Sequence, residues 1–178
     1  MLVNLRRAAV LAVLLIVLCL VYTFVETGIG QLVFTHQANG SITAYGSTEI
    51  GQAWNGPKWF QGRDETPNPE LSGPTNLGPR SEVLVQQVKE RVTQLEKEGI
   101  TPTNDLVTGS GSGIDPDITP ADAYAQVNAV AKANDLPVGE VRHLVAEQSV
   151  GANLGFFGSP YVNLLEINEA LAKLATTA

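Results

Sequence analysis

The feature that most constrains this chain is an uncharged apolar run near its start. Residues Ala8 to Val25 contain no Asp, Glu, Lys or Arg and are almost entirely aliphatic. As an α-helix this run would rise about 27 Å, close to the thickness of the hydrocarbon core of a bilayer. We therefore predict a transmembrane anchor helix over residues 8–25, preceded by a short N-terminal segment over residues 1–7.

The charges that flank the run predict its orientation. Arg6 and Arg7 precede it, and Glu26 follows it. The positive-inside rule then predicts a cytoplasmic N-terminus and an extracytoplasmic domain over residues 26–178, in a single-pass protein of the cell membrane. A cleaved signal peptide is the alternative. We favour the uncleaved anchor, because the run is long for a signal peptide and no small-x-small cleavage motif follows it.

Charge and cysteine content exclude several classes of function. The chain of 178 residues has a formal net charge of -7, and all of its acidic residues lie at or after Glu26. This balance argues against nucleic acid as a partner. The single cysteine, Cys19, lies inside the apolar run, so neither an intrachain disulfide nor a cysteine-based metal site is available.

The rest of the chain predicts one α+β domain with short strands first and several helices after them. Extended segments are expected between residues 42 and 51, where glycines interrupt the chain. Residues 52–62 carry both tryptophans and Phe60, a density of aromatic side chains that usually anchors a small core. Residues 63–80 are rich in Pro, Gly and Asn and predict a long loop.

A helix is predicted from Glu82 to Glu98, with Ser81 as its N-cap and Gly99 at its end. Its apolar stripe comprises Leu84, Val88, Val92 and Leu95, and its solvated face was assigned Lys89, Glu90, Arg91, Glu96 and Lys97.

Three further helices follow. One covers residues 120–133, with Tyr124, Val127, Val130 and Ala131 facing inward, and a second runs from Pro137 to about Gln148. The last begins with a capping box formed by Asn163 and Glu166. Its inner face comprises Leu164, Leu165, Ile167, Leu171 and Leu174.

The stretch from Asp105 to Gln126, called the central stretch below, is rich in small residues and aspartates. Its Gly-Ser-Gly-Ser-Gly part exposes backbone N–H groups, as a phosphate cradle does, but it lacks the Gly-Lys-Ser/Thr ending of a P-loop. Thr119 is a good N-cap, Pro120 suits the first helical position, and Asp122 favours the positive end of the helix dipole. We therefore predict an ordered turn that leads into a helix.

No catalytic or metal-binding pattern stands out among the residues. His36 and His143 lack paired ligands at helical spacing and are interpreted as structural. Asp115 and Asp117 resemble the start of a calcium loop, but Pro120 occupies the place of the required glycine, so turn formation and capping explain them better. An interaction subunit is favoured over an enzyme. Two alternatives stay open, namely an anchored extracytoplasmic enzyme that uses Asp115, Asp117 and His143, and a cation-binding module.

Taken together, the motifs resemble the KdpC family, the small subunit of the bacterial KdpFABC potassium-transporting P-type ATPase. The resemblance runs through almost the whole chain, in the anchor, Asn39-Gly40-Ser41, Trp59-Phe60-Gln61-Gly62-Arg63, Ser72-Gly73-Pro74-Thr75-Asn76-Leu77-Gly78-Pro79, Ser112-Gly113-Ile114-Asp115-Pro116-Asp117-Ile118-Thr119-Pro120 and Val162-Asn163-Leu164-Leu165-Glu166. Among the departures, Pro74-Thr75 replaces a commoner Gly-Ser.

The resemblance implies a non-catalytic subunit that stabilises the assembly of the pump. Its implied partners are the membrane, a potassium-channel-like subunit (KdpA), the P-type ATPase subunit (KdpB) and a small membrane peptide (KdpF). The family is also described as a catalytic chaperone that raises the ATP affinity of the P-type subunit. No tightly bound cofactor is expected, and ATP is expected only in a transient complex with that subunit.

The candidate contact residues are part of the same expectation. Leu71-Ser72-Gly73 is similar to the start of the LSGGQ signature of ABC transporters, which makes Ser72 and Gly73 the candidates for nucleotide contact. The candidates for partner contact lie in the blocks that carry the resemblance, and they are Trp59, Phe60, Arg63, Asn76 and Asp115.

Overall fold

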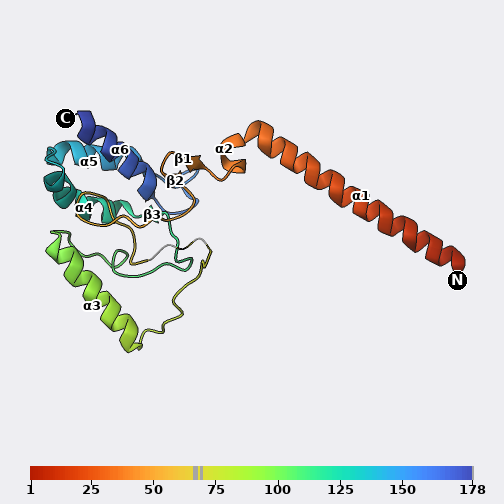
Figure 1. Ribbon diagram of the computed structural model, residues 1–178, viewed down its shortest axis with the longest axis horizontal. Coiled ribbons are helices and arrows are strands. Elements are labelled where there is room, and N and C mark those ends of the chain that lie inside the picture. Colours follow the sequence, from red (N-terminus) through yellow and green to blue (C-terminus); the bar gives the residue numbers. More distant parts are fainter. Residues whose placement is uncertain (66–67, 69, 178) are drawn as a thin grey trace. The chain divides into compact units, whose positions relative to one another are not determined.

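The chain folds into two units that are described separately here, residues 1–42 and residues 43–178 (Figure 1). The computed structural model describes residues 1–65, 68 and 70–177. Its helices and short strands confirm the predicted α+β class.

The first unit is dominated by one long apolar helix, α1 (Leu2–Val33), which a single-turn helix, α2 (Thr35–Ala38), follows. By length and composition α1 can cross a membrane, and it extends beyond both ends of the predicted span. None of its residues is buried. The hydroxyls of Thr23 and Thr27 donate to the carbonyl oxygens of the residues four positions earlier, at 2.8 Å each, so they are satisfied within the helix.

The second unit combines four helices with very short strands. Strands β1 (Ile42–Thr43) and β2 (Gly46–Ser47) form a hairpin at its start. The helices are α3 (Glu82–Lys97), α4 (Pro120–Ala133), α5 (Val138–Gln148) and α6 (Leu164–Thr177). The remaining strands are β3 (Asp117–Ile118), β4 (Ser149–Val150) and β5 (Tyr161–Asn163).

The larger sheet has the strand order β3-β5-β4 and is antiparallel throughout. Asp117 pairs with Asn163 on one side of β5, and Val150 pairs with Tyr161 on the other. The early strands agree with the prediction, but this later sheet was not predicted. Segments of two or three residues are too short to show the alternation that identifies a strand in sequence.

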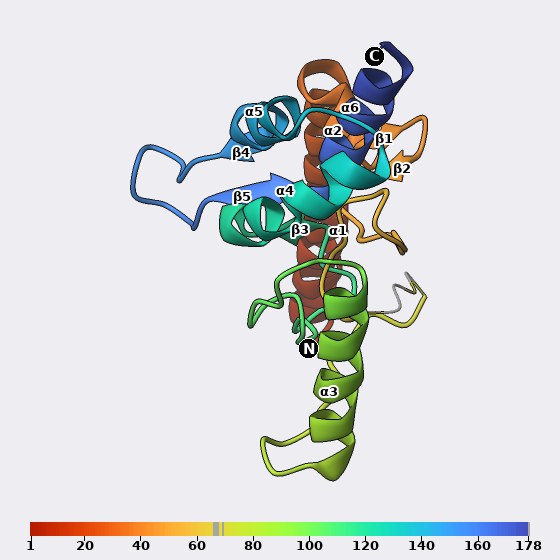
Figure 2. The ribbon, with the colours of Figure 1, turned by 90° about the vertical axis from the view of Figure 1, so that its left-hand side faces the viewer.

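Helix α4 is central because both of its faces are buried. One face joins α5, α6 and Phe60 in the larger core, through Ala123, Val127, Val130 and Ala131. The opposite side of α4 presents Ala129 to a smaller core with Leu95, Ile100, Leu106 and Val107, which attaches the end of α3. Figure 2 shows α3 extending away from the layer that α4, α5 and α6 form with the strands.

The predicted helix starts and stops are confirmed where local chemistry sets them. The Ser81 hydroxyl accepts from the backbone N–H of Leu84, and Gly99 follows α3 with a φ of 77°. Thr119 and Asp122 form a complete capping box at α4. At α6, the side chain of Asn163 accepts from the N–H of Glu166 at 3.2 Å.

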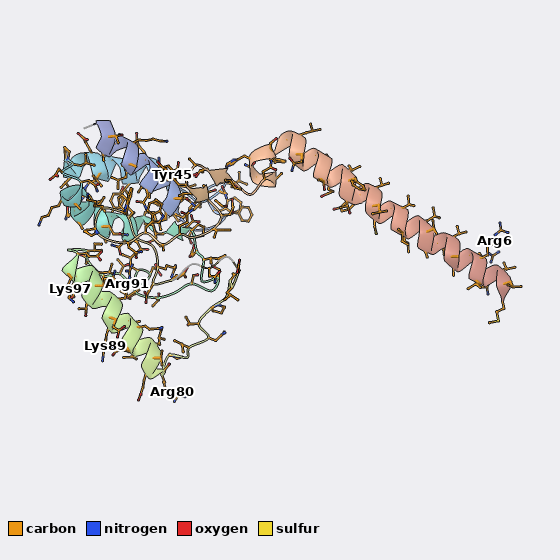
Figure 3. The ribbon with its side chains drawn as sticks, viewed as in Figure 1. Arg6, Tyr45, Arg80, Lys89, Arg91 and Lys97 are labelled. Carbon is orange, nitrogen blue, oxygen red and sulfur yellow. The ribbon has the colours of Figure 1, made fainter. Side chains whose placement is uncertain are left out.

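Two side chains were assigned to the wrong environment. Arg91 is buried, at 8% exposure, because its position three residues after Val88 and four before Leu95 places it on the inner face of α3 (Figure 3). Tyr124 is exposed at 37%, and its ring lies 5.7 Å from the Arg142 guanidinium of α5. In the case of Arg91, residue type was given more weight than the helical spacing that places it on the inner face.

The long loop predicted for residues 63–80 is present. Residues 66, 67 and 69 lie outside the described residues, and the described part of the loop contains neither helix nor strand. Its two ends attach to the same helix, because Arg91 of α3 donates to the carbonyl oxygen of residue 62 and residue 81 caps the start of α3.

Candidate functional site

The candidate site is the junction where residues 59–65 and 71–73 meet residues 105–117. Three buried polar side chains hold the first of these segments in place. Asn168 of α6 accepts from the N–H of Phe60 and donates to its carbonyl oxygen, at 2.9 Å each. Gln126 of α4 brackets Gln61 in the same way, at 2.7 and 2.9 Å. Each amide thereby replaces the neighbouring strand that an extended segment normally needs.

Arg91 of α3 completes this support. Its Nη2 donates to the carbonyl oxygen of Gly62 at 3.1 Å, and its Nε donates to that of Leu106 at 3.2 Å. Burial lowers the pKa of Arg91, and the carboxylates of Asp64 and Glu98 oppose that shift. The guanidinium therefore joins the 59–65 segment to the start of the central stretch as a shared donor for two backbone carbonyls.

Arg63 and Glu65 hold the central stretch from the other side. The Nε of Arg63 donates to Asp115 Oδ2 at 3.1 Å, and its Nη2 lies 3.5 Å from Asp105 Oδ1. The Glu65 carboxylate accepts from the backbone N–H of Ser110 and, at 3.1 Å, from that of Asp115. Two oppositely charged side chains, Arg63 and Glu65, thus both contact the segment from residue 105 to residue 115.

One N–H group of the Gly-Ser-Gly-Ser-Gly segment, that of Ser110, binds an anion, and this anion is the Glu65 carboxylate of the same chain. The Ser110 hydroxyl oxygen accepts from the backbone N–H groups of Ser112 and Gly113, at 3.2 and 2.9 Å. The Ser112 hydroxyl accepts from Ile114 at 3.2 Å. These backbone donors are therefore used within the domain.

The candidates for nucleotide contact, Ser72 and Gly73, lie against this turn. The Ser72 hydroxyl and the Gly73 N–H both donate to the carbonyl oxygen of Ser112, at 3.0 and 2.6 Å. Gly113 has a φ of 70°, and a Cβ there would lie 2.6 Å from the Gly73 carbonyl oxygen. Only a glycine allows the two loops to approach this closely.

Two cavities lie at the junction. The first has a volume of about 300 Å³, and its lining includes Asp64, Glu65, Ser110 and Gly113, with no lysine or arginine among the described lining residues. Burial raises the pKa of Asp64, and Arg91 opposes the shift. The second cavity, of about 200 Å³, is lined by charges of both signs, including Arg63, Arg91, Asp64 and Asp115.

Asp117 is the most strongly perturbed carboxyl group of the described residues. Burial is the main cause and raises its pKa to about 6, while the hydrogen bond from Asn163 Nδ2, at 2.9 Å, works in the opposite direction. The carboxylates of Asp115, Glu49 and Glu166 raise the pKa further. Asp117 also closes the turn, since its N–H donates to Asp115 Oδ1 at 3.1 Å.

The pKa of Asp117 predicts a pH dependence of stability. A folded-state pKa above the unfolded value of about 3.9 means that the protonated form stabilises the fold, and that this contribution is lost as the pH rises from about 4 through about 6. We expect Asp117→Asn, whose oxygen can still accept from Asn163, to be more stable than the wild type at about pH 7.5, by about 1 kcal/mol once solvent screening is included. The advantage should shrink towards pH 4.

Fluorescence of Trp54 and Trp59 during urea unfolding measures this effect, because both tryptophans pack against the larger core. The exposed Asp135→Asn, which makes the same substitution away from the junction, is the matched control against which the pH dependence of Asp117→Asn is compared. A constant difference between Asp117→Asn and the wild type at all pH values would contradict the prediction.

The structure separates the predicted partner-contact residues into three groups. Arg63 and Asp115 meet at the junction. Phe60 is fully buried and Trp59 packs against the same core, with its ring centroid 5.0 Å from that of Trp54. Asn76 lies apart from the other candidates, in an exposed part of the 63–80 loop, with a φ of 56°. Their roles as contacts stay predictions, but Phe60 presents no side-chain surface to a partner.

The residues of the alternative enzyme hypothesis are occupied elsewhere. The Asp115 carboxylate accepts from the backbone N–H of Asp117. His143 is exposed on α5, where its Nε2 lies 3.2 Å from Glu147 of the same helix. Among the described residues, no group of three His, Cys, Asp or Glu side chains is placed to hold a metal ion.

Sequence reasoning missed the polar residues on which the junction depends most, Arg91, Gln126 and Asn168. A signal was present, because each occupies an inner-face position of its helix. Gln126 lies three residues after Ala123 and four before Val130, and Asn168 lies three residues before Leu171. A polar residue inside an apolar stripe indicates a buried hydrogen-bonding role.

Comparison with known proteins gives one consistent family. Residues 5–173 match the family described as KdpC, K+-transporting ATPase, c chain. The chain is 42% identical over 186 residues to the potassium-transporting ATPase KdpC subunit of Sorangium cellulosum, with 96% of this chain and 98% of that protein covered. It is 44% identical over 176 residues to the KdpC subunit of Burkholderia ambifaria, with 91% of each covered. KdpC subunit 1 of Nostoc is 38% identical over 187 residues, with 93% of each covered.

Proposed function

The chain belongs to the KdpC family of K+-transporting ATPase subunits, and we propose that it is a non-catalytic subunit that stabilises the assembly of the ATP-driven potassium uptake pump. The name of the family already makes it one chain of a larger complex. The more specific role, assembly rather than chemistry, follows from the way in which the domain uses its polar groups.

The observation that carries this proposal is that the candidate site is occupied by its own side chains. A catalytic group must be free to meet a substrate. Here Arg63 and Glu65 both bind Asp115 in the central stretch. Gln126 and Asn168 bind the backbone of residues 60–61. This arrangement gives rigid loops of defined shape, which reduces the entropic cost of binding a partner.

The anchor supports the same role. Every apolar side chain of α1 is exposed within this chain, so lipid and the membrane-embedded subunits are proposed to cover it. With Arg6 and Arg7 at the cytoplasmic side, the domain would lie outside the cell membrane. Its proposed partners are the channel-like subunit (KdpA), the P-type subunit (KdpB) and the small membrane peptide (KdpF).

The proposal is tested by purifying the pump from cells with and without this chain. Without it, we expect the complex of the other subunits to dissociate at a lower temperature, as measured by size-exclusion chromatography after heating, and to lose potassium-stimulated ATP hydrolysis. Adding back the full chain should restore both. A complex that stays intact and fully active without this chain would exclude the assembly role.

The family is also described as raising the ATP affinity of the P-type subunit through a transient complex with ATP. We favour the assembly role, because the topology proposed above puts the domain on the side of the membrane that lacks ATP. Ser72 and Gly73 are the candidate contacts for ATP, and Ser72 is exposed on its loop. The test compares the KM for ATP of pumps assembled with Ser72→Ala and with Thr101→Ala, an exposed hydroxyl elsewhere. A raised KM with Ser72→Ala alone would support nucleotide contact, whereas an unchanged KM would count against it.

A further inference from the structure

The most exposed apolar side chains of residues 43–178 include those on the loop between β4 and β5, residues 151–160, called the aromatic loop below. The exposed fractions of Leu154, Phe156 and Phe157 are 84%, 71% and 59%. Figure 2 shows this connection projecting beyond α4 and α5. Three large apolar side chains gathered at the tip of one loop form a patch of the kind that marks an interaction site.

The aromatic loop is ordered by its own backbone. The N–H of Asn153 donates to the carbonyl oxygen of Phe157 at 2.8 Å, and the N–H of Phe157 donates to that of Asn153 at 2.9 Å. The ring centroids of Phe156 and Phe157 lie 4.2 Å apart. A loop whose polar backbone groups are paired internally presents its side chains at a small entropic cost on binding.

The aromatic loop holds the backbone of Leu154 in an unfavourable conformation. The φ of this residue is 53°, in the left-handed region that costs a side chain such as leucine about 1 kcal/mol or more. Its side chain is almost fully exposed, so no packing within the domain offsets this cost. Contact with a partner would offset it.

The charge pattern identifies the class of partner. No Asp, Glu, Lys, Arg or His occurs from Gln148 to Leu165, in a chain whose net charge is -7. Loops that bind a bilayer surface usually carry Lys or Arg beside their apolar residues, and an acidic domain is repelled by anionic lipid. Aromatic residues without charge are instead typical of the buried centre of protein–protein interfaces.

We propose that the aromatic loop docks into an apolar, uncharged hollow on another polypeptide subunit of the same pump, and this inference rests on the function proposed above. Phe156 and Phe157 enter the hollow, and Leu154 packs at its edge. The loop then forms a second attachment in addition to the membrane helix. Each attachment strengthens the other, because the tether raises the effective concentration of the second binding site.

The test measures the affinity of the full chain for the assembly of the other pump subunits, purified in non-ionic detergent without this chain. We expect the double variant Phe156→Ser/Phe157→Ser to raise the Kd by about 30-fold, which corresponds to about 2 kcal/mol. Val83→Ser, which removes an exposed apolar side chain from α3, is the matched control and should bind as the wild type does. Because the anchor is the same in all variants, the ratio of Kd values reports the loop.

The outcomes separate this inference from the function on which it rests. A wild-type chain that does not bind the assembly overturns both. A wild-type chain that binds, with a double variant of equal affinity and equal urea midpoint, overturns the docking loop alone. In a Cys19→Ser background, a fluorophore on Phe156→Cys that doxyl-labelled phosphatidylcholine quenches in the complete reconstituted pump identifies the bilayer as the occupant, which also overturns it.

Discussion

Replacing Asn168 with leucine is expected to lower the free energy of unfolding of the domain by about 2–6 kcal/mol. Leucine has a similar volume but no polar atoms, so the N–H and the carbonyl oxygen of Phe60 would both lose their partner. Asn168 is fully buried, so water does not replace the lost bonds at this position. Each unsatisfied buried group costs about 1–3 kcal/mol, and two are created at once.

Urea unfolding of the full chain in non-ionic detergent measures this loss. Tryptophan fluorescence reports the domain alone, because both tryptophans lie between residues 52 and 62. Asn128→Leu, on the exposed face of α4, makes the same substitution without removing a buried partner. We expect it to change the free energy of unfolding by less than about 0.5 kcal/mol. Equal effects of the two variants would contradict the role assigned to Asn168.

Deleting residues 1–25 is expected to remove the chain almost completely from the membrane and from the purified pump. The deletion takes away the uncharged run, whose insertion is effectively irreversible on the time scale of purification. Potassium-stimulated ATP hydrolysis should fall with the loss of the chain. Membrane flotation and co-purification with tagged pump subunits measure the two effects separately.

A scrambled anchor of identical composition is the matched control for this deletion. It should keep the chain in the membrane, because hydrophobicity alone drives insertion. If the scrambled chain also stays with the pump, insertion is the whole role of α1, whereas its loss from the pump would show that α1 packs specifically against other helices. A deletion variant that remains fully bound to an active pump would contradict the proposed role of the anchor.

Several elements were predictable because their signals are local. The start of α4 depends on Thr119, Pro120 and Asp122, which are neighbours in the chain, and all three take the expected positions. The end of α3 depends in the same way on Gly99. Capping and tight turns are decided within a few residues, so their sequence patterns are sufficient to place them.

The candidate site was only partly predictable. Arg63, Ser72, Gly73 and Asp115 were named, and they do lie at one junction. The sequence did not predict that the Glu65 carboxylate accepts from the N–H groups of Ser110 and Asp115, so the structural role that these residues share was not evident. A segment rich in glycine and serine indicates only that backbone N–H donors are available, and the acceptor can come from any part of the chain.

The long apolar helix, the domain built mainly from capped amphipathic helices, and the membership of one family are all evident from the sequence, because each of these depends on residue type and short spacing. The folded structure is needed to show which backbone groups Arg91, Gln126 and Asn168 bind, that strands of two and three residues form the second sheet, and that the aromatic loop is exposed. These properties depend on contacts between residues far apart in the chain, and short spacings in the sequence do not specify which distant groups meet.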